Sequence, residues 1–148
     1  MYQELFQNRK NSDDNSKVAT AGLALGIGAD MCPHLLYRLL NGEMAQLQSN
    51  VTVLASRLLQ PAVWWVLIGT NDAGAAFCEA EQIVTGTIQI VQQILDRRPA
   101  STIVVNSILP RAGYKSRLGP GWYDTLTTVN RQMECYTASK ARVEFVNA

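Results

Sequence analysis

The chain has 148 residues, 47% of them apolar, and a formal net charge of +1 from thirteen basic and twelve acidic side chains. This length fits a single domain with a sizeable core. The near-neutral charge provides no basic field of the kind that attracts nucleic acid or an anionic membrane. No apolar run in the sequence is long enough to cross a bilayer.

The three cysteines, Cys32, Cys78 and Cys135, are far apart and form no Cys-x-x-Cys pattern. An odd, scattered set favours free thiols in a reducing compartment over a disulfide framework or a zinc site. The first sixteen residues are polar and lack the apolar core of a secretory signal. We therefore predict a cytoplasmic protein with no bound metal.

Strands and helices are predicted to alternate along the chain. Apolar, β-branched runs predict strands at 18–25, 63–68, 102–108 and 142–146. Periodic apolar residues predict helices over 43–60, 79–98 and 122–140, and one that begins with Asp30 as its N-cap and stops at Asn41-Gly42. This alternation predicts an α/β fold with a parallel, doubly wound sheet.

The most informative segment is the apolar run Val63–Ile68, which leads into Gly69-Thr70-Asn71-Asp72. Six consecutive apolar residues predict a strand that is buried on both faces. Open parallel sheets bind ligands at the carboxyl ends of their strands, where Asn71 would lie. Its side-chain N–H donors could stabilise an oxyanion. The alternative interpretation of Asn-Asp is a turn followed by a helix cap.

Three segments carry a resemblance that spans almost the whole chain. They are Leu25-Gly-Ile-Gly-Ala-Asp30 leading into His34-Leu-Leu-Tyr-Arg-Leu-Leu-Asn-Gly-Glu43, then Val66-Leu-Ile-Gly-Thr-Asn-Asp72, and Val105-Asn-Ser-Ile-Leu-Pro-Arg111. Together they resemble the SGNH (GDSL-type) hydrolases, in the branch of the platelet-activating-factor acetylhydrolase catalytic subunits. The resemblance implies an incomplete three-layer, flavodoxin-like parallel-sheet fold. It also implies serine-based hydrolysis of lipid or carbohydrate esters, no cofactor, and a possible homodimer.

The resemblance assigns site residues position by position. Asn71 matches the family's asparagine that donates to the oxyanion hole, and Gly69 and Asp72 flank it as supporting residues. The family's second donor, normally a glycine backbone N–H, falls on Ala29. If the backbone has a positive φ there, alanine costs about 1 kcal/mol or more and misaims the donor.

Two blocks of the family are absent from this sequence. It contains neither the Gly-Asp-Ser block of the nucleophile nor the Asp-x-x-His block of the base. Ser12 lies in a polar loop and is not a substitute, and His34, the only histidine, is predicted to be a structural residue on a helix surface. The chain thus resembles a partial domain over residues 1–148, and we predict that it is inactive by itself. A family strand missing beside 63–68 would also leave that strand without a ladder partner.

Other conspicuous features have structural interpretations. Trp64 and Trp65 are predicted to pack in the core, and the Met44–Leu58 apolar stripe is predicted to pack rather than to anchor a membrane. Arg111 follows a strand, so either a surface role or a substrate role is open.

Two other functions compete with ester hydrolysis. A degenerate, non-catalytic paralogue would act at most as a binding or dimerisation module. A flavodoxin-like nucleotide or flavin binder would share the sheet, but Gly26-Ile-Gly28 is too short for a phosphate-binding fingerprint.

Overall fold

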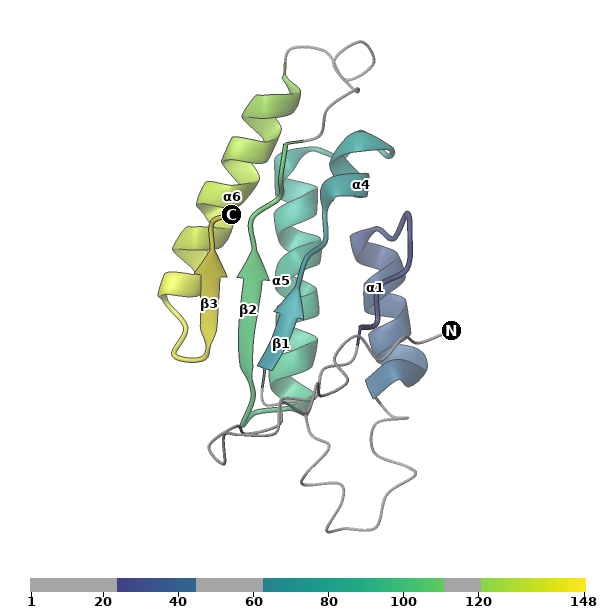
Figure 1. The fold of residues 1–148 in the computed structure, drawn as a ribbon, viewed down its shortest axis with the longest axis vertical. Helices are drawn as coiled ribbons and strands as arrows, with labels where there is room; N and C mark the ends of the chain where they lie inside the picture. The colour runs from purple at the N-terminus through teal and green to yellow at the C-terminus, as the bar shows by residue number, and fades with distance from the viewer. Residues whose placement is uncertain (1–23, 45–62, 111–120) are drawn as a thin grey trace, which may run out of the picture.

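The computed structural model of the protein describes residues 24–44, 63–110 and 121–148. In these residues three parallel strands form a sheet in the order β1 (Val63–Val66), β2 (Thr102–Asn106) and β3 (Val143–Val146), as Figure 1 shows. Three predicted strands and their parallel arrangement are therefore confirmed. Three predictions concern residues outside the described ranges. They are the strand at 18–25, of which only the last two residues are described, the helix at 43–60, of which only the first two are described, and Arg111.

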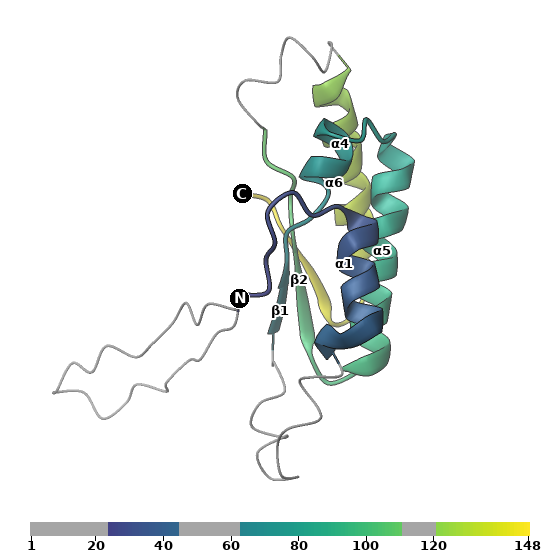
Figure 2. The ribbon, with the colours of Figure 1, turned by 90° about the vertical axis from the view of Figure 1, so that its right-hand side faces the viewer.

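The helices of the described part lie on one face of this sheet (Figure 2). They are α1 (Cys32–Arg38), the π-helical turn η1 (Leu39–Glu43), the short α4 (Thr70–Gly74), α5 (Ala80–Arg97) and α6 (Trp122–Ala138). The long helix α5 packs between α1 and α6. The alternating order of strands and helices places the carboxyl ends of all three strands at one edge of the sheet.

Helix α5 forms where the apolar spacing predicts it, and both of its ends are fixed. Its inward face carries the buried residues Ile83, Val84, Thr87, Ile90, Val91 and Ile94. At its start the Glu79 N–H donates to Gln82 Oε1 at 2.9 Å. At its end Arg97 donates to the Leu39 carbonyl at 2.7 Å, and Arg98 donates to the Met44 carbonyl at 3.1 Å. The two arginines thus tie the end of α5 to the carbonyl groups in and just after η1.

The prediction that β1 is buried on both faces is wrong for the described part of the chain. Burial alternates along this strand, so that Trp64 and Val66 face the helices while Trp65 is 64% exposed. Val63 and Leu67 lie on the same exposed face as Trp65. The reason is that the described helices cover only the other face. Strand β1 is also at the edge of the described sheet, because it pairs only with β2.

Strand β2 is buried on both faces, as its sequence predicts. Ile103, Val104 and Val105 are all buried. The register places Ile103 beside Trp64 on one side and beside Val143 on the other. This central strand therefore forms the core of the described sheet.

The start of α1 differs from the prediction. Its N-cap is Met31 rather than Asp30, because the Asp30 carboxylate forms an ion pair with Arg38 instead. The predicted break at Gly42 is confirmed, since the backbone leaves the helical conformation there. The Asp30 side chain is thus part of a loop contact and not of a helix cap.

Gly69 provides the first testable prediction. Its φ of +102° is a left-handed conformation, and a Cβ atom would lie 2.8 Å from Ile108 Cδ1 and 2.9 Å from Ile83 Cγ2. We expect Gly69→Ala to lower the free energy of unfolding in urea by about 2 kcal/mol or more, from backbone strain and overpacking. The control is Gly121→Ala, where a Cβ would meet nothing within 4 Å. Equal stability of the two variants would contradict this packing.

Candidate functional site

Asn71 lies at the carboxyl edge of the sheet, as predicted. It is in the first turn of α4, which follows β1 after three residues. Gly69 at the N-cap of α4 has a left-handed conformation, which turns the chain sharply from the strand into the helix. The Asn71 side chain is half-buried at this position.

The Asn71 amide joins α4 to the loop that precedes α1. Its Nδ2 donates a hydrogen bond to the Asp30 carbonyl oxygen at 2.8 Å. Ala29, the residue before Asp30, is exposed and has a φ of +67°. The structure therefore brings the loop of Ala29 to the side chain of Asn71, although the two residues are 42 positions apart in the sequence.

The backbone at Ala29 is the left-handed conformation that the sequence analysis considered. A turn forms it, in which the Asp30 N–H donates to the Ile27 carbonyl at 3.3 Å. An alanine in this region costs about 1 kcal/mol relative to glycine, because its Cβ crowds the neighbouring carbonyl. The loop therefore holds a strained residue beside Asn71.

Asp72 makes a second contact between the same two elements. Its carboxylate is buried, at 4% exposure, and both oxygens accept from the Cys32 N–H, at 3.0 and 3.1 Å. Cys32 is the first residue of α1, so this N–H has no acceptor within its own helix. The cap interpretation of Asn-Asp is thus partly right, but Asp72 caps α1 and not the helix that contains it.

An ion-pair network fixes the other side of the loop. Arg38 pairs with Asp30, donates to Glu43 Oε1 at 2.8 Å and donates to the Leu25 carbonyl at 3.2 Å. Burial raises the pKa of the Glu43 carboxyl above its ordinary value, and the attraction of Arg38 offsets only part of this effect. Arg38 therefore holds both ends of the segment that includes Ala29.

The two thiols next to Asp72 are poor nucleophiles. Burial, and then the charge of Asp72, raises the pKa of Cys32 to about 12. The same two causes raise the pKa of Cys78. Because the thiolate is the reactive form of cysteine, a raised pKa lowers the reactivity of both thiols at neutral pH.

His34 makes a structural contact. It is exposed on α1, and its Nδ1 accepts the Met31 N–H at 3.3 Å, which caps its own helix. Within residues 24–44, 63–110 and 121–148, no cluster of three or more His, Cys, Asp or Glu side chains could hold a metal ion. In the same residues no helix is long and apolar enough to span a membrane.

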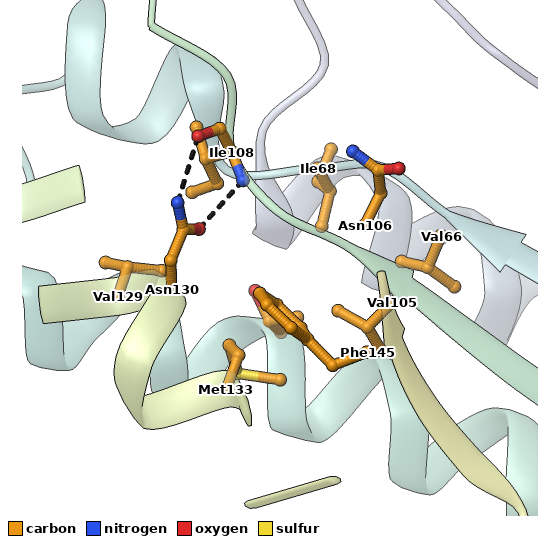
Figure 3. Close-up of a pocket in the computed structure, with 10 residues that line it drawn as sticks. Val66, Ile68, Val105, Asn106, Ile108, Val129, Asn130, Met133 and Phe145 are labelled. Carbon is orange, nitrogen blue, oxygen red and sulfur yellow. Dashed lines mark hydrogen bonds between the residues drawn. The ribbon is translucent and has the colours of Figure 1, made fainter. Parts of the chain in front are cut away.

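A small cavity lies between the sheet and α6 (Figure 3). Its volume of about 10 Å³ leaves room for about one water molecule. Beside it Asn130 accepts the Ile108 N–H at 2.8 Å and donates to the Ile108 carbonyl at 3.1 Å. Neither Asn71 nor Ala29 lines this cavity, so Asn130 braces the segment after β2 and takes no part in the candidate site.

The chain is similar in sequence to known proteins. The chain is 32% identical over 126 residues to platelet-activating factor acetylhydrolase IB subunit alpha1 of Bos taurus, a match that covers 85% of this chain and 46% of the relative. It is 37% identical over 89 residues to subunit alpha2 of Rattus norvegicus, which covers 60% of this chain and 32% of the relative. No family model matches the chain.

Solved structures share the fold. A Streptococcus pneumonia structure described as a platelet activating factor matches with a TM-score of 0.56 and 22% identity, over 80% of this chain and 50% of that one. A carbohydrate esterase family 3 protein from Talaromyces cellulolyticus matches with a TM-score of 0.52 and 16% identity, over 81% of this chain and 49% of that one. The chain is related to the SGNH-type hydrolases. It spans about half the length of the curated alpha1 relatives that it matches.

The candidate site was predicted from the sequence only in part. Asn71, Ala29, Gly69 and Asp72 were candidates, and the structure brings all four to one edge of the sheet. The contacts of Cys32 and Arg38 were missed.

Ala29 provides a test of the loop geometry. We expect Ala29→Gly to raise the free energy of unfolding by about 0.5 kcal/mol, because relief of the left-handed strain exceeds the entropy that glycine gains in the unfolded chain. Urea denaturation measures this change. The control is Ala75→Gly, at an exposed position with a φ of −107°. There is no left-handed strain for glycine to relieve at this position, so we expect the substitution to lower the free energy of unfolding. A destabilised Ala29→Gly protein would contradict the strained loop.

Proposed function

We propose that the chain carries the oxyanion-binding part of an SGNH-type ester-hydrolase site. In this proposal the Asn71 side chain and the Ala29 backbone N–H are two donors to one substrate oxygen, and Gly69 and Asp72 hold them in place. The observation that supports it is the 2.8 Å hydrogen bond from Asn71 Nδ2 to the carbonyl of Asp30, which joins the start of α4 to the loop that contains Ala29.

The chemistry proposed for this site is the hydrolysis of acyl or acetyl esters of a lipid or a carbohydrate. The relatives are named as acetylhydrolase subunits, and the structural neighbours include a carbohydrate esterase. Fixed N–H donors at a developing oxyanion are a main source of rate in acyl transfer. The mechanism needs no metal or organic cofactor, because the family's nucleophile is a serine activated by a histidine.

We further propose that this chain does not hydrolyse esters by itself. Its sequence contains no Gly-Asp-Ser and no Asp-x-x-His, and His34 is occupied as a helix-capping residue. The thiols of Cys32 and Cys78 are held protonated, since burial and the charge of Asp72 raise the pKa of each. Donors alone have no attacking group to assist.

A second candidate function is a binding or dimerisation module. The exposed apolar face of β1, with Val63, Trp65 and Leu67, supports it, because apolar patches often mark partner surfaces. Under this proposal a second copy of the chain or another protein covers the face. A Gly-Asp-Ser block upstream of this reading frame in the genome, with an Asp-x-x-His block downstream, would argue against a non-catalytic paralogue.

The activity proposal predicts no turnover of p-nitrophenyl acetate above a buffer control. Oxyanion donors are worth about 10²–10³ each in rate, but only beside a positioned nucleophile. The matched variant is Asn71→Ala. Turnover above the control that disappears in this variant would show a working site, and the proposal of an inactive chain would be wrong.

A further inference from the structure

The loop between α4 and α5 contains an unusual residue, Phe77. Its φ is +54°, and it is one of two non-glycine residues with a positive φ in the described part of the chain; the other is Ala29. A left-handed conformation costs a side chain roughly 1–2 kcal/mol, and glycine or asparagine is the usual residue after a helix end. The ring is 63% exposed, so little burial within the described chain compensates for this cost.

Backbone hydrogen bonds to the candidate site hold Phe77 in this conformation. On one side the N–H groups of Ala75 and Ala76 donate to the Asn71 carbonyl, at 2.7 and 3.2 Å. On the other side the Cys78 N–H donates to the Asp72 carbonyl at 3.0 Å. Phe77 lies between these hydrogen bonds, so its exposed ring extends from a loop that is hydrogen-bonded to the backbone of Asn71 and Asp72.

A second exposed apolar residue lies on the opposite loop. Ile27, which is 55% exposed, is two residues before Ala29 and accepts the hydrogen bond of the turn that contains it. The loop of Ile27 contacts Asn71 through Asp30, and the loop of Phe77 contacts Asn71 directly. Apolar side chains therefore stand on two loops that are both hydrogen-bonded to Asn71, one through its side-chain amide and the other through its backbone carbonyl.

We propose that Phe77 is a specificity-determining residue that contacts the apolar acyl chain of an ester whose carbonyl oxygen lies at Asn71. This inference rests on the proposed function of Asn71. Strained, exposed residues at such a position are a recurring feature of ligand sites, where the ligand provides the contacts that the free protein lacks. Acyl groups longer than acetyl should therefore gain affinity from the ring.

The test uses acetate and hexanoate as probes, since their carboxylates stand in for the anionic oxygen. Each is titrated into the ¹⁵N-labelled chain while the Asn71 side-chain amide is followed by NMR. The test variant is Phe77→Gly, which removes the ring and relieves the strain of the left-handed backbone conformation, so we expect it to fold. The control is Tyr37→Ala, which removes a 67% exposed ring from α1.

We expect Phe77→Gly to weaken hexanoate binding about tenfold and to change acetate binding less than about twofold. Tyr37→Ala should change neither. Hexanoate affinity that is unchanged in Phe77→Gly, or equally weakened in Tyr37→Ala, would overturn the role of Phe77 and leave the proposed function intact. If neither probe shifts the Asn71 amide of the unchanged chain, both the proposed function and this inference are wrong.

Discussion

The buried carboxylate of Asp72 is the contact on which the candidate site depends. Asp72 is in α4, and its two carboxylate oxygens accept a hydrogen bond from the N–H of Cys32, the first residue of α1, at 3.0 and 3.1 Å. The two residues are 40 positions apart in the sequence. A buried carboxylate without such a donor would cost several kcal/mol, and the N–H would lack an acceptor as well. Both groups are satisfied only when α1 begins against α4. The loop of Ala29 is then held beside Asn71 by the hydrogen bond to Asp30.

The site is thus built from backbone strain and long-range polar contacts on a simple scaffold. Strand β1 places Asn71 and Asp72 at the edge of the sheet. The turn between them and the strand requires glycine at position 69, because its φ is left-handed and because a Cβ atom there would collide with Ile83 and Ile108. Arg38 then fixes the far side of the loop through Asp30, Glu43 and the Leu25 carbonyl. Stability and proposed function therefore share the same residues, which explains why strain is tolerated at Ala29 and Phe77.

The strands and the position of Asn71 were predictable because they follow from local patterns. Runs such as Ile103–Val105 are apolar and β-branched, and polar residues after a parallel strand lie at its carboxyl end. The partners of these residues were not predictable, since no local pattern links Asp72 to Cys32 or Asn71 to Asp30. The exposure of Trp65 was missed for a related reason. An apolar run shows what a strand can bury, but not which of its faces the described helices cover.

The most direct test of the account is hydrogen exchange at the Cys32 amide in the native chain and in Asp72→Ala. We expect exchange of this amide to accelerate by about 10–100-fold, the equivalent of losing one buried hydrogen bond, with a shifted Ala29 resonance. The Ile103 amide, which donates to the Arg142 carbonyl at 2.8 Å in the sheet, is the internal reference and should not change. An equally protected Cys32 amide and an unmoved Ala29 resonance would show that Asp72 does not position the loop.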